Sequence, residues 1–261
     1  MSWEAVGWLA GLLGLGFSAR YTWWRRPLTG VPVLMYHHIT DQLGGTPLPK
    51  LRVSPKSFAR QLDILLARGY RTVALGQALS PEAPPRPVVL TFDDGYADFY
   101  EQAWPLLRER GMTATVFLVT GALDGTNLWD HDKGEPSEAL MSREQVRELD
   151  AAGVEFGGHT HTHRELTTLD ERGLRREITG CQKALTDLLG RPSRVFSYPY
   201  GLFTPTAAEA VTRAGFTAAC TTRPGLLGPR TEPLMVPRII VKRSDDSIDF
   251  RLKLTRGRSR L

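Results

Sequence analysis

The sequence predicts an α/β fold, a closed or partly closed (β/α) barrel of seven or eight strands. Three observations support this class. Short apolar runs alternate with amphipathic helical patterns, which is typical of a parallel sheet covered by helices. The chain has 261 residues, 41% of them hydrophobic and 23% charged, enough for one large globular domain. Acidic residues and histidines follow the apolar runs, where the active sites of such barrels collect.

The expected elements follow from local signals. Apolar runs bounded by Gly or Pro predict strands, and runs with a helical apolar period between a Ser or Thr cap and a Gly predict helices. In chain order, these signals predict a strand at 31–37, a helix at 54–69, strands at 70–75 and 85–95, a helix at 98–111, a strand at 113–120, a helix at 142–153, a strand at 154–158, a helix at 164–190, a strand and turn at 193–201, a helix at 204–215, and strands at 216–222 and 236–241.

The N-terminal segment differs from the rest of the chain. Residues 5–19 form an uncharged run of 15, which is shorter than the ~20 residues that a membrane span needs. An extension over residues 3–24 reaches that length but includes Arg20. No early Lys or Arg precedes the run, so an uncleaved anchor is favoured over a cleaved signal peptide. We therefore expect residues 1–29 to be a membrane anchor or signal segment with a linker, and residues 30–261 to be one catalytic domain.

The charge and the cysteines exclude some functions. The net charge is +5 and the pI is about 9.4. Basic and aromatic residues do not interleave, so we expect no nucleic-acid partner. The tail at 251–261 is predicted to be a frayed basic end. Cys181 and Cys220 fit no metal-binding spacing.

Three of the six histidines stand at alternating positions in the segment VEFGGHTHTHREL. They are His159, His161 and His163. Residues four apart share a face in a helix and in a strand, whereas residues two apart share one only in a strand. His159 and His163 are therefore the favoured pair of metal ligands. The pair alone is equally compatible with a solvated, Thr-rich turn, so a third ligand has to be found.

Two adjacent acids supply that ligand. The segment VVLTFDDGY places Asp93 and Asp94 at the end of an apolar strand, where neighbouring side chains point in different directions. A helix N-cap, the structural alternative, needs only one Asp. Asp94 with His159 and His163 forms the two-His, one-carboxylate set of a hydrolytic zinc site, and Asp93 is left as the general base. Zinc is the metal expected from these ligands, although nickel or cobalt fits them too.

At these residues the sequence resembles a known family. TFDDG, HTHTH and YPYG resemble the first three motifs of the NodB-homology polysaccharide deacetylases, carbohydrate esterase family four. The resemblance covers about residues 30–250. It implies the distorted, seven-stranded NodB-type barrel, Asp93 as the base, and a divalent metal held by Asp94, His159 and His163. It also implies that the backbone N–H of Tyr200 stabilises the reaction's oxyanion.

The sequence departs from this family pattern at two places. Ser197 occupies the position of the third-motif Arg that orients the base, and no histidine follows His163 to serve as the acid. However, VPVLMYHHI resembles the opening strand of the poly-N-acetylglucosamine deacetylase branch, which takes its acid from this strand and lacks the same Arg. That branch implies that His37 is the general acid and that His38 points elsewhere. A capping or core pair of histidines is the structural alternative.

Three further residues, Trp129, Arg238 and Tyr198, are predicted to contact the substrate or to orient the base. The loop at 121–141 is long for its position, and its Trp129, Asp130 and His131 are candidates to line a sugar groove, with Trp129 stacking on a sugar ring. A simple irregularity of the surface is the structural alternative. His131 in the same loop is a weaker rival for the acid role. Arg238, at a late strand end, is predicted to orient the base in place of the missing Arg. Tyr198 in the third motif is predicted to contact the substrate.

The expected function is metal-dependent removal of N-acetyl groups from N-acetylglucosamine units of a cell-surface or extracellular polysaccharide. Peptidoglycan, a lipid-linked saccharide or an O-acetyl ester are alternative substrates, and a non-catalytic carbohydrate-binding domain is the alternative from another class. The expected partners are the polysaccharide and, through residues 1–29, a membrane. The arginines after the apolar run favour a cytoplasmic body, whereas the substrate favours a periplasmic or extracellular one. The orientation therefore stays open.

Overall fold

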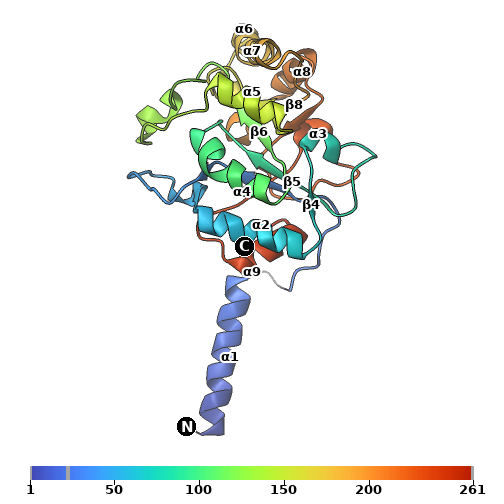
Figure 1. The fold of residues 1–261 in the computed structure, drawn as a ribbon. Coiled ribbons are helices and arrows are strands. Elements are labelled where there is room, and N and C mark those ends of the chain that lie inside the picture. Colours follow the sequence, from blue (N-terminus) through green and yellow to red (C-terminus); the bar gives the residue numbers. More distant parts are fainter. Residues whose placement is uncertain (1, 22–23, 260–261) are drawn as a thin grey trace.

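The computed structural model describes residues 2–21 and 24–259. Its strands are β1 Val33–Tyr36, β2 His38–Ile39, β3 Arg52–Val53, β4 Arg71–Thr72, β5 Pro87–Phe92, β6 Thr115–Leu118, β7 Glu155–Gly158, β8 Val195–Ser197, β9 Ala218–Cys220 and β10 Ile239–Ile240. Its α-helices are α1 Trp3–Arg20, α2 Pro55–Ala67, α3 Leu75–Ala78, α4 Trp104–Glu109, α5 Arg143–Ala151, α6 Glu171–Leu174, α7 Gly180–Leu189, α8 Pro205–Arg213 and α9 Ser247–Arg256. Helix α1 projects away from a body that contains all of these strands (Figure 1).

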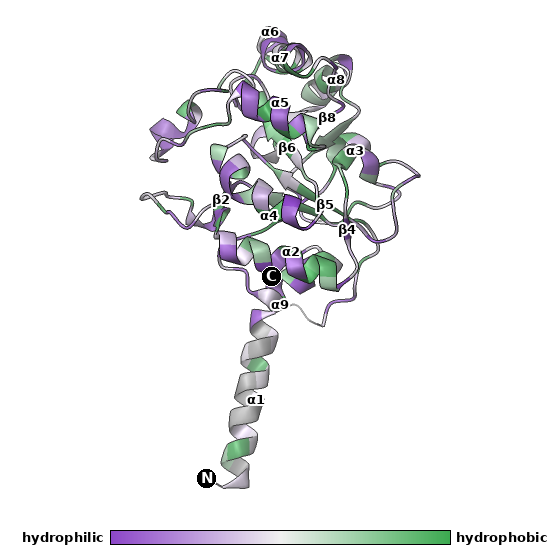
Figure 2. Ribbon diagram, viewed as in Figure 1, coloured by the Kyte–Doolittle hydropathy of each residue, from purple (hydrophilic) through white to green (hydrophobic). Residues whose placement is uncertain are grey.

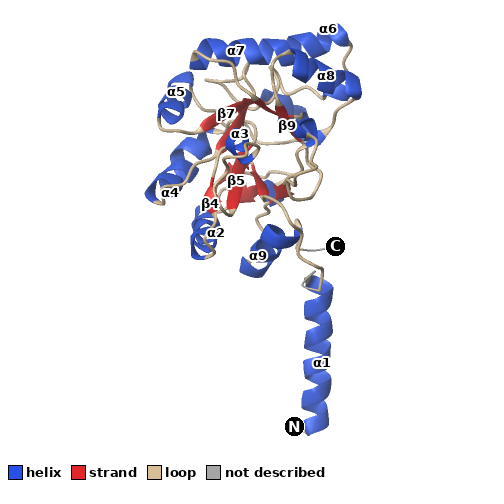
Figure 3. Cartoon of the chain, turned by 90° about the vertical axis from the view of Figure 1, so that its right-hand side faces the viewer, coloured by secondary structure: helices blue, strands red, loops and turns tan. Residues whose placement is uncertain are grey.

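The main sheet is parallel and curled. Its strands run in the order β10-β1-β5-β6-β7-β8-β9, and β4 pairs with β5 outside this path. A single parallel bridge between Cys220 and Val236 links the end of β9 to the residues just before β10. Figure 3 shows the strands in the centre with helices arranged around them. The predicted seven-stranded, distorted barrel is confirmed.

Side chains of the strands alternate between two apolar layers. In β5, Val88, Leu90 and Phe92 belong to the large core under the helices, whereas Val89 belongs to a smaller cluster on the inner face. Continued by one residue, this alternation turns Asp93 to the inner face. In the same way, Tyr36 packs outward and the next residue, His37, turns inward. The alternation of side chains along the strands thus places Asp93 and His37 on the inner face of the curled sheet.

Helices α2 and α5 begin where the sequence predicts. Ser54 caps α2 by accepting a hydrogen bond from the backbone N–H of Ser57, and Pro55 occupies the first turn. Ser142 and Gln145 form a capping box at the start of α5. Figure 2 shows hydrophilic and hydrophobic residues interspersed along α2 and α5, as expected for helices that pack one face on a sheet.

Two predicted segments differ from the structure. The helix expected at 164–190 begins only after Asp170, whose side chain accepts from the N–H of Gly173 and caps it. The tail expected to be frayed is helical as far as α9 extends, so that prediction was wrong. Asp246 and Asp249 form a capping box there, and the buried Phe250 anchors the helix in the core. The sequence did not predict this helix because its many charges obscure the capping residues and the apolar face.

Helix α1 is tied to the body at its C-terminal end. The Arg20 guanidinium donates to Asp249 Oδ1 and Oδ2 at 2.9 and 2.7 Å, and Asp249 is fully buried. In the described part of the chain, no helix combines the length and the apolar character that crossing a bilayer requires. Residues 22–23 of the predicted anchor lie outside the described residues. The anchor and the division into residues 1–29 and 30–261 stay predictions.

Candidate active site

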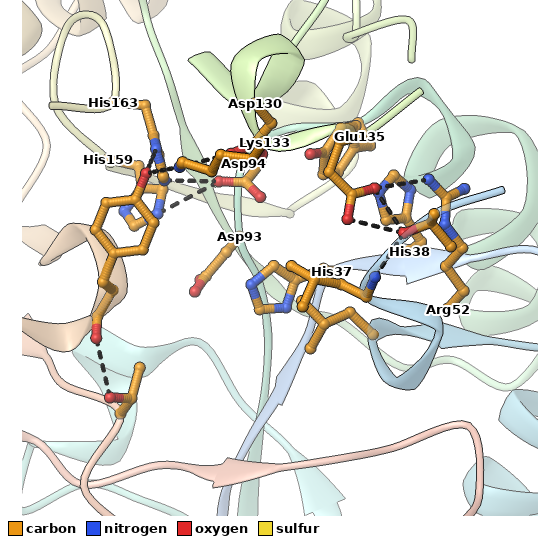
Figure 4. A pocket seen from close by; sticks show the side chains of 16 residues that line it. His37, His38, Arg52, Asp93, Asp94, Asp130, Lys133, Glu135, His159 and His163 are labelled. Carbon is orange, nitrogen blue, oxygen red and sulfur yellow. Dashed lines mark hydrogen bonds and ion pairs between the residues drawn. The ribbon is translucent and has the colours of Figure 1, made fainter. Parts of the chain in front are cut away.

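A pocket of about 150 Å³ opens at the carboxyl ends of β1, β5, β7 and β8. Side chains that the sequence placed far apart meet in its lining (Figure 4). The predicted site residues found there are His37, Asp93, Asp94, His159, His163 and Tyr200. This is the end of the sheet at which parallel (β/α) folds place their chemistry.

Asp94, His159 and His163 form a candidate metal centre. One ligand atom from each lies within 4.8 Å of the other two, and all three residues are buried. The Asp94 Oδ1 atom is 3.4 Å from Nε2 of His159 and 3.3 Å from Nε2 of His163. Within the described residues, this buried oxygen has no hydrogen-bond partner. An orphaned carboxylate oxygen that faces two imidazoles fits a divalent metal such as zinc.

The protonation of these groups suits metal binding. Burial lowers the pKa of His159 to about 4, so its ring is neutral at neutral pH, as a ligand must be. The Nδ1–H of His159 donates to the backbone carbonyl of Ser197 at 2.7 Å, which leaves the Nε2 lone pair for the metal. Burial would raise the pKa of Asp94, but the neighbouring His163 outweighs it and holds this pKa below its usual range.

The backbone at the site adopts left-handed conformations that non-glycine residues rarely use. Asp94, His163 and Tyr200 have φ values of 74°, 61° and 58°. Gly95 also has a positive φ, 82°, and a Cβ there would lie 2.8 Å from the Leu118 side chain. The chain therefore turns sharply after β5, which lets adjacent carboxylates face different partners. Such conformations persist where the surrounding structure enforces them, and they cluster at functional sites.

The turn of the HTHTH motif is held by contacts that sequence reasoning missed. The backbone N–H of His163 donates to Thr160 Oγ1 at 2.9 Å. The buried Glu177, on the following helical segment, accepts from the backbone N–H groups of His161 and Thr162 at 3.1 and 2.8 Å. The His161 ring lies away from the centre, with Nδ1 3.1 Å from Thr120 Oγ1. No motif signals Glu177, because it is separated from the turn in sequence.

Asp93 is held by Arg238. Oδ1 and Oδ2 of Asp93 accept from Nη1 and Nη2 of Arg238 at 2.6 and 2.8 Å. The remaining guanidinium hydrogens go to Thr91 Oγ1, Ser197 Oγ and the Thr221 carbonyl, at 3.2, 3.0 and 3.0 Å. All five N–H donors of this guanidinium thus have partners. Burial would raise the pKa of Asp93, but Arg238 outweighs it and lowers this pKa, so the carboxylate stays ionised.

This arrangement places Arg238 behind the pocket rather than in its lining. Its side chain is buried, so it reaches Asp93 and not a substrate. Ser197, at the position of the third-motif Arg, accepts a hydrogen bond from this guanidinium. Arg238 is therefore not a substrate contact, and this prediction is corrected. Its predicted contact with Asp93 is present.

His37 follows β1 and faces Asp93 across the pocket (Figure 4). Its Nδ1 is buried without a hydrogen-bond partner among residues 2–21 and 24–259. Burial lowers the pKa of His37. The adjacent His38 pairs instead with Asp98, whose Oδ2 lies 2.8 Å from its Nδ1. A ring beside the base with an open nitrogen is available for proton transfer.

Tyr198 and Trp129 lie in different places from those expected. Tyr198 is fully buried and stacks on Phe203 at 4.5 Å in the outer core, so its prediction as a substrate contact is corrected. Strand alternation is the cause, because the residue before it, Ser197, faces inward. Trp129 stacks on the His163 ring at 4.9 Å, and its buried Nε1 has no partner in the described part of the chain. His131 does not line the pocket.

The comparisons with known proteins decide the family. The profile named polysaccharide deacetylase matches residues 80–219, more than half of the chain. The chain belongs to the polysaccharide deacetylase family. The motifs quoted above lie at its metal centre and base, so the resemblance seen in the sequence is confirmed.

Individual relatives of this chain indicate which branch of the family it is most similar to. It is 30% identical to the polysaccharide-deacetylase-like protein YxkH of Bacillus subtilis over 75% of this chain and 65% of that protein. It is 25% identical to the poly-beta-1,6-N-acetyl-D-glucosamine N-deacetylase of Staphylococcus aureus, over 77% of this chain and 71% of that one. The structure of IcaB from Ammonifex degensii superposes with a TM-score of 0.69 at 27% identity, covering 83% and 94% of the two chains.

These relatives support the poly-N-acetylglucosamine deacetylase branch of the family. The deacetylase spans about two thirds of the length of the curated relatives that it matches. Its departures from the family pattern, Ser197 in the third motif and the absence of a histidine after His163, are those that the resemblance to this branch implied.

Proposed function

We propose that this protein hydrolyses N-acetyl groups from N-acetylglucosamine units of a polysaccharide, with a divalent metal held by Asp94, His159 and His163. The single observation that carries the proposal is an ionised carboxylate, Asp93, that is fixed by Arg238 beside this ligand set. A binding module would have no use for a buried, oriented base at a metal centre. Similarity to the Staphylococcus aureus enzyme supports the choice of substrate.

The metal would supply a Lewis acid and lower the pKa of a bound water. The two imidazoles and one carboxylate favour zinc, and nickel or cobalt would suit the same donors. The protein's own part begins with Asp93, which would take the proton of the attacking water. Arg238 would keep its carboxylate ionised and aimed into the pocket. The water oxygen would then bond to the acetamide carbon.

Proton delivery would complete the reaction. His37 lies on the opposite side of the pocket from the metal ligands and would protonate the sugar nitrogen as the carbon–nitrogen bond breaks. Acetate and a free amino sugar would leave. The backbone N–H of Tyr200 would stabilise the oxyanion, a role implied by the family resemblance.

We also propose that the protein acts on the outer side of a membrane, attached through residues 1–29. The uncharged run at 5–19 and the exposed Trp3 and Trp8 support attachment. Fractionation of cells that produce the full chain, followed by protease treatment of intact cells, tests this. Release of the protein from the membrane fraction by salt alone would refute the attachment. Protection of the body from protease in intact cells would refute the outer location.

Acetate release tests the proposed chemistry. The full chain would be incubated with oligomers of N-acetylglucosamine, with peptidoglycan fragments and with an O-acetylated sugar, before and after chelation. We expect chelator-sensitive acetate release from the N-acetylglucosamine oligomers, which returns when zinc is restored. Release only from one of the other two substrates would replace the proposed substrate, and no release from any of them would reject the deacetylase activity.

A further inference from the structure

The two histidines of the metal centre have different partners on their outer ring nitrogens. Nδ1 of His159 faces a backbone carbonyl, that of Ser197. Nδ1 of His163 instead lies 3.2 Å from the phenol oxygen of Tyr200. The Lys133 ammonium contacts the same phenol oxygen and lies 4.5 Å from the centroid of the tyrosine ring (Figure 4).

These partners differ in what they allow. A carbonyl only accepts hydrogen bonds, so His159 must carry its proton on Nδ1 and present Nε2 as a lone pair. A phenol both donates and accepts, so on its own it would leave the proton of His163 on either nitrogen. The Nε2 atom of His163 is 3.3 Å from Asp94 Oδ1, and a proton there would satisfy the carboxylate but block the metal.

Lys133 fixes the phenol oxygen of Tyr200. An ammonium is a donor only, so this oxygen accepts from Lys133. Asp130 Oδ1, 2.8 Å from Nζ, holds the ammonium in place. The second lone pair of the phenol oxygen then lies beside His163 Nδ1 and can accept the Nδ1–H when His163 binds a metal through Nε2.

We propose that the Tyr200 hydroxyl, held by Lys133, is a positioning group that accepts from Nδ1 of His163 and orients this ring for metal binding. The inference rests on the proposed metal site and adds a side-chain role for Tyr200 to the backbone role stated above. When His163 donates from Nδ1, its Nε2 lone pair faces the site, and the phenol O–H can donate into the pocket that Tyr200 lines. Lys133 thereby links the loop over the site to the strength of metal binding.

The backbone of Tyr200 supports a fixed position for this hydroxyl. Its φ of 58° is left-handed, and Thr222 Oγ1 donates to its carbonyl at 3.2 Å. A Cβ at the neighbouring Gly201 would lie 2.2 Å from Thr222 Oγ1, so glycine is required for the close packing of this turn. The Tyr200 ring is also edge-on to the His163 ring at 5.0 Å. The turn therefore presents the phenol to His163 in one geometry.

Metal affinity tests this role without using activity. The full chain would be stripped of metal, and zinc would be titrated in competition with a chelating dye. We expect Tyr200→Phe to raise the Kd for zinc on the order of 10- to 100-fold, the usual cost of losing a ligand's outer partner. Lys133→Met should raise the Kd by a smaller factor, and Lys133→Arg should restore most of the affinity because it keeps the donor and the charge.

Tyr100→Phe is the matched control. Its hydroxyl donates to Glu148 at 2.8 Å on an outer helix, away from the pocket, so the Kd should stay at the wild-type value. A wild-type Kd for a folded Tyr200→Phe variant would overturn the inference while leaving the metal site intact. If Tyr200→Phe does not fold, a wild-type Kd for Lys133→Met would overturn it. Failure of the wild-type chain itself to bind zinc, cobalt or nickel would reject the metal site and this inference together.

Discussion

The two sides of the pocket are built in different ways. The inner wall is Asp93, backed by Arg238 and Ser197, and each of these side chains is buried and comes from a strand or a strand end. The outer wall is His163, Tyr200 and Lys133, which stand on loops and short 3-10 helices, and Tyr200 and Lys133 are exposed. The sheet therefore fixes the proposed base, whereas loops fix the surroundings of one proposed metal ligand.

The two walls should therefore respond differently to substitution. A buried charge that loses its partner is strongly destabilising, because it is left desolvated and unpaired. A partly exposed partner can be replaced by water. Changes in the inner wall should thus affect both folding and turnover, whereas changes in the outer wall should affect metal affinity and leave folding nearly unchanged.

Arg238→Met should have the largest combined effect. It leaves the Asp93 carboxylate buried without its partner, which we expect to lower the free energy of unfolding by about 3–5 kcal/mol. Turnover should fall on the order of 10²-fold or more, because the base loses its orientation. Chemical denaturation and acetate release measure the two effects. The exposed pair Arg191–Asp150 provides the control, since Arg191→Met should cost less than about 1 kcal/mol. Equal losses of unfolding free energy in the two variants would contradict the view that the inner wall depends on the pairing of Arg238 with Asp93.

His37→Gln should reduce turnover and spare the fold. Loss of a general acid typically costs about 10²- to 10⁴-fold in rate. The His37 Nδ1 atom has no partner among the described residues, so its loss should change the melting temperature little. Zinc affinity should also stay the same, which separates this role from that of a ligand. Comparable turnover in wild type and His37→Gln would move the acid role to another residue.

Ser197→Ala should have the smallest effect. It removes one of the hydrogen bonds to the Arg238 guanidinium, at 3.0 Å, and leaves both bonds to Asp93. A single hydrogen bond of this kind contributes about 1 kcal/mol, so stability should fall by about that amount and turnover by less than about 10-fold. Thermal denaturation and acetate release measure both. A loss as large as that of Arg238→Met would mean that Ser197 itself, and not Arg238, orients the base.

The same comparison shows what the sequence could predict. The metal ligands and the base stand in short local motifs, and strand alternation turns them to one face. Arg238 could be proposed because it is a basic residue beside a late strand, immediately before β10. Tyr198 was misjudged, since motif membership was given more weight than the alternation that buries it in the outer core.

The contacts that join distant loops could not be predicted. Glu177 reaches the histidine turn from a helical segment, and Lys133 contacts Tyr200 across the pocket lining. Both contacts depend on the path of loops that carry no periodic signal. Arg52 is another case. It is buried at the rim of the pocket and pairs with Glu138 at 2.7 Å, although nothing in its sequence neighbourhood indicates a partner so far along the chain. Pairings of this kind arise only when the fold brings loops together.

The most direct test of the central claim compares the wild-type chain with Asp93→Asn at known metal content. Zinc binding and acetate release from N-acetylglucosamine oligomers would be measured on the same samples. We expect the variant to bind zinc with wild-type stoichiometry and to release acetate on the order of 10²- to 10⁴-fold more slowly, because the proposed base is lost while the three proposed metal ligands remain. Wild-type acetate release from a zinc-loaded Asp93→Asn variant would contradict the account.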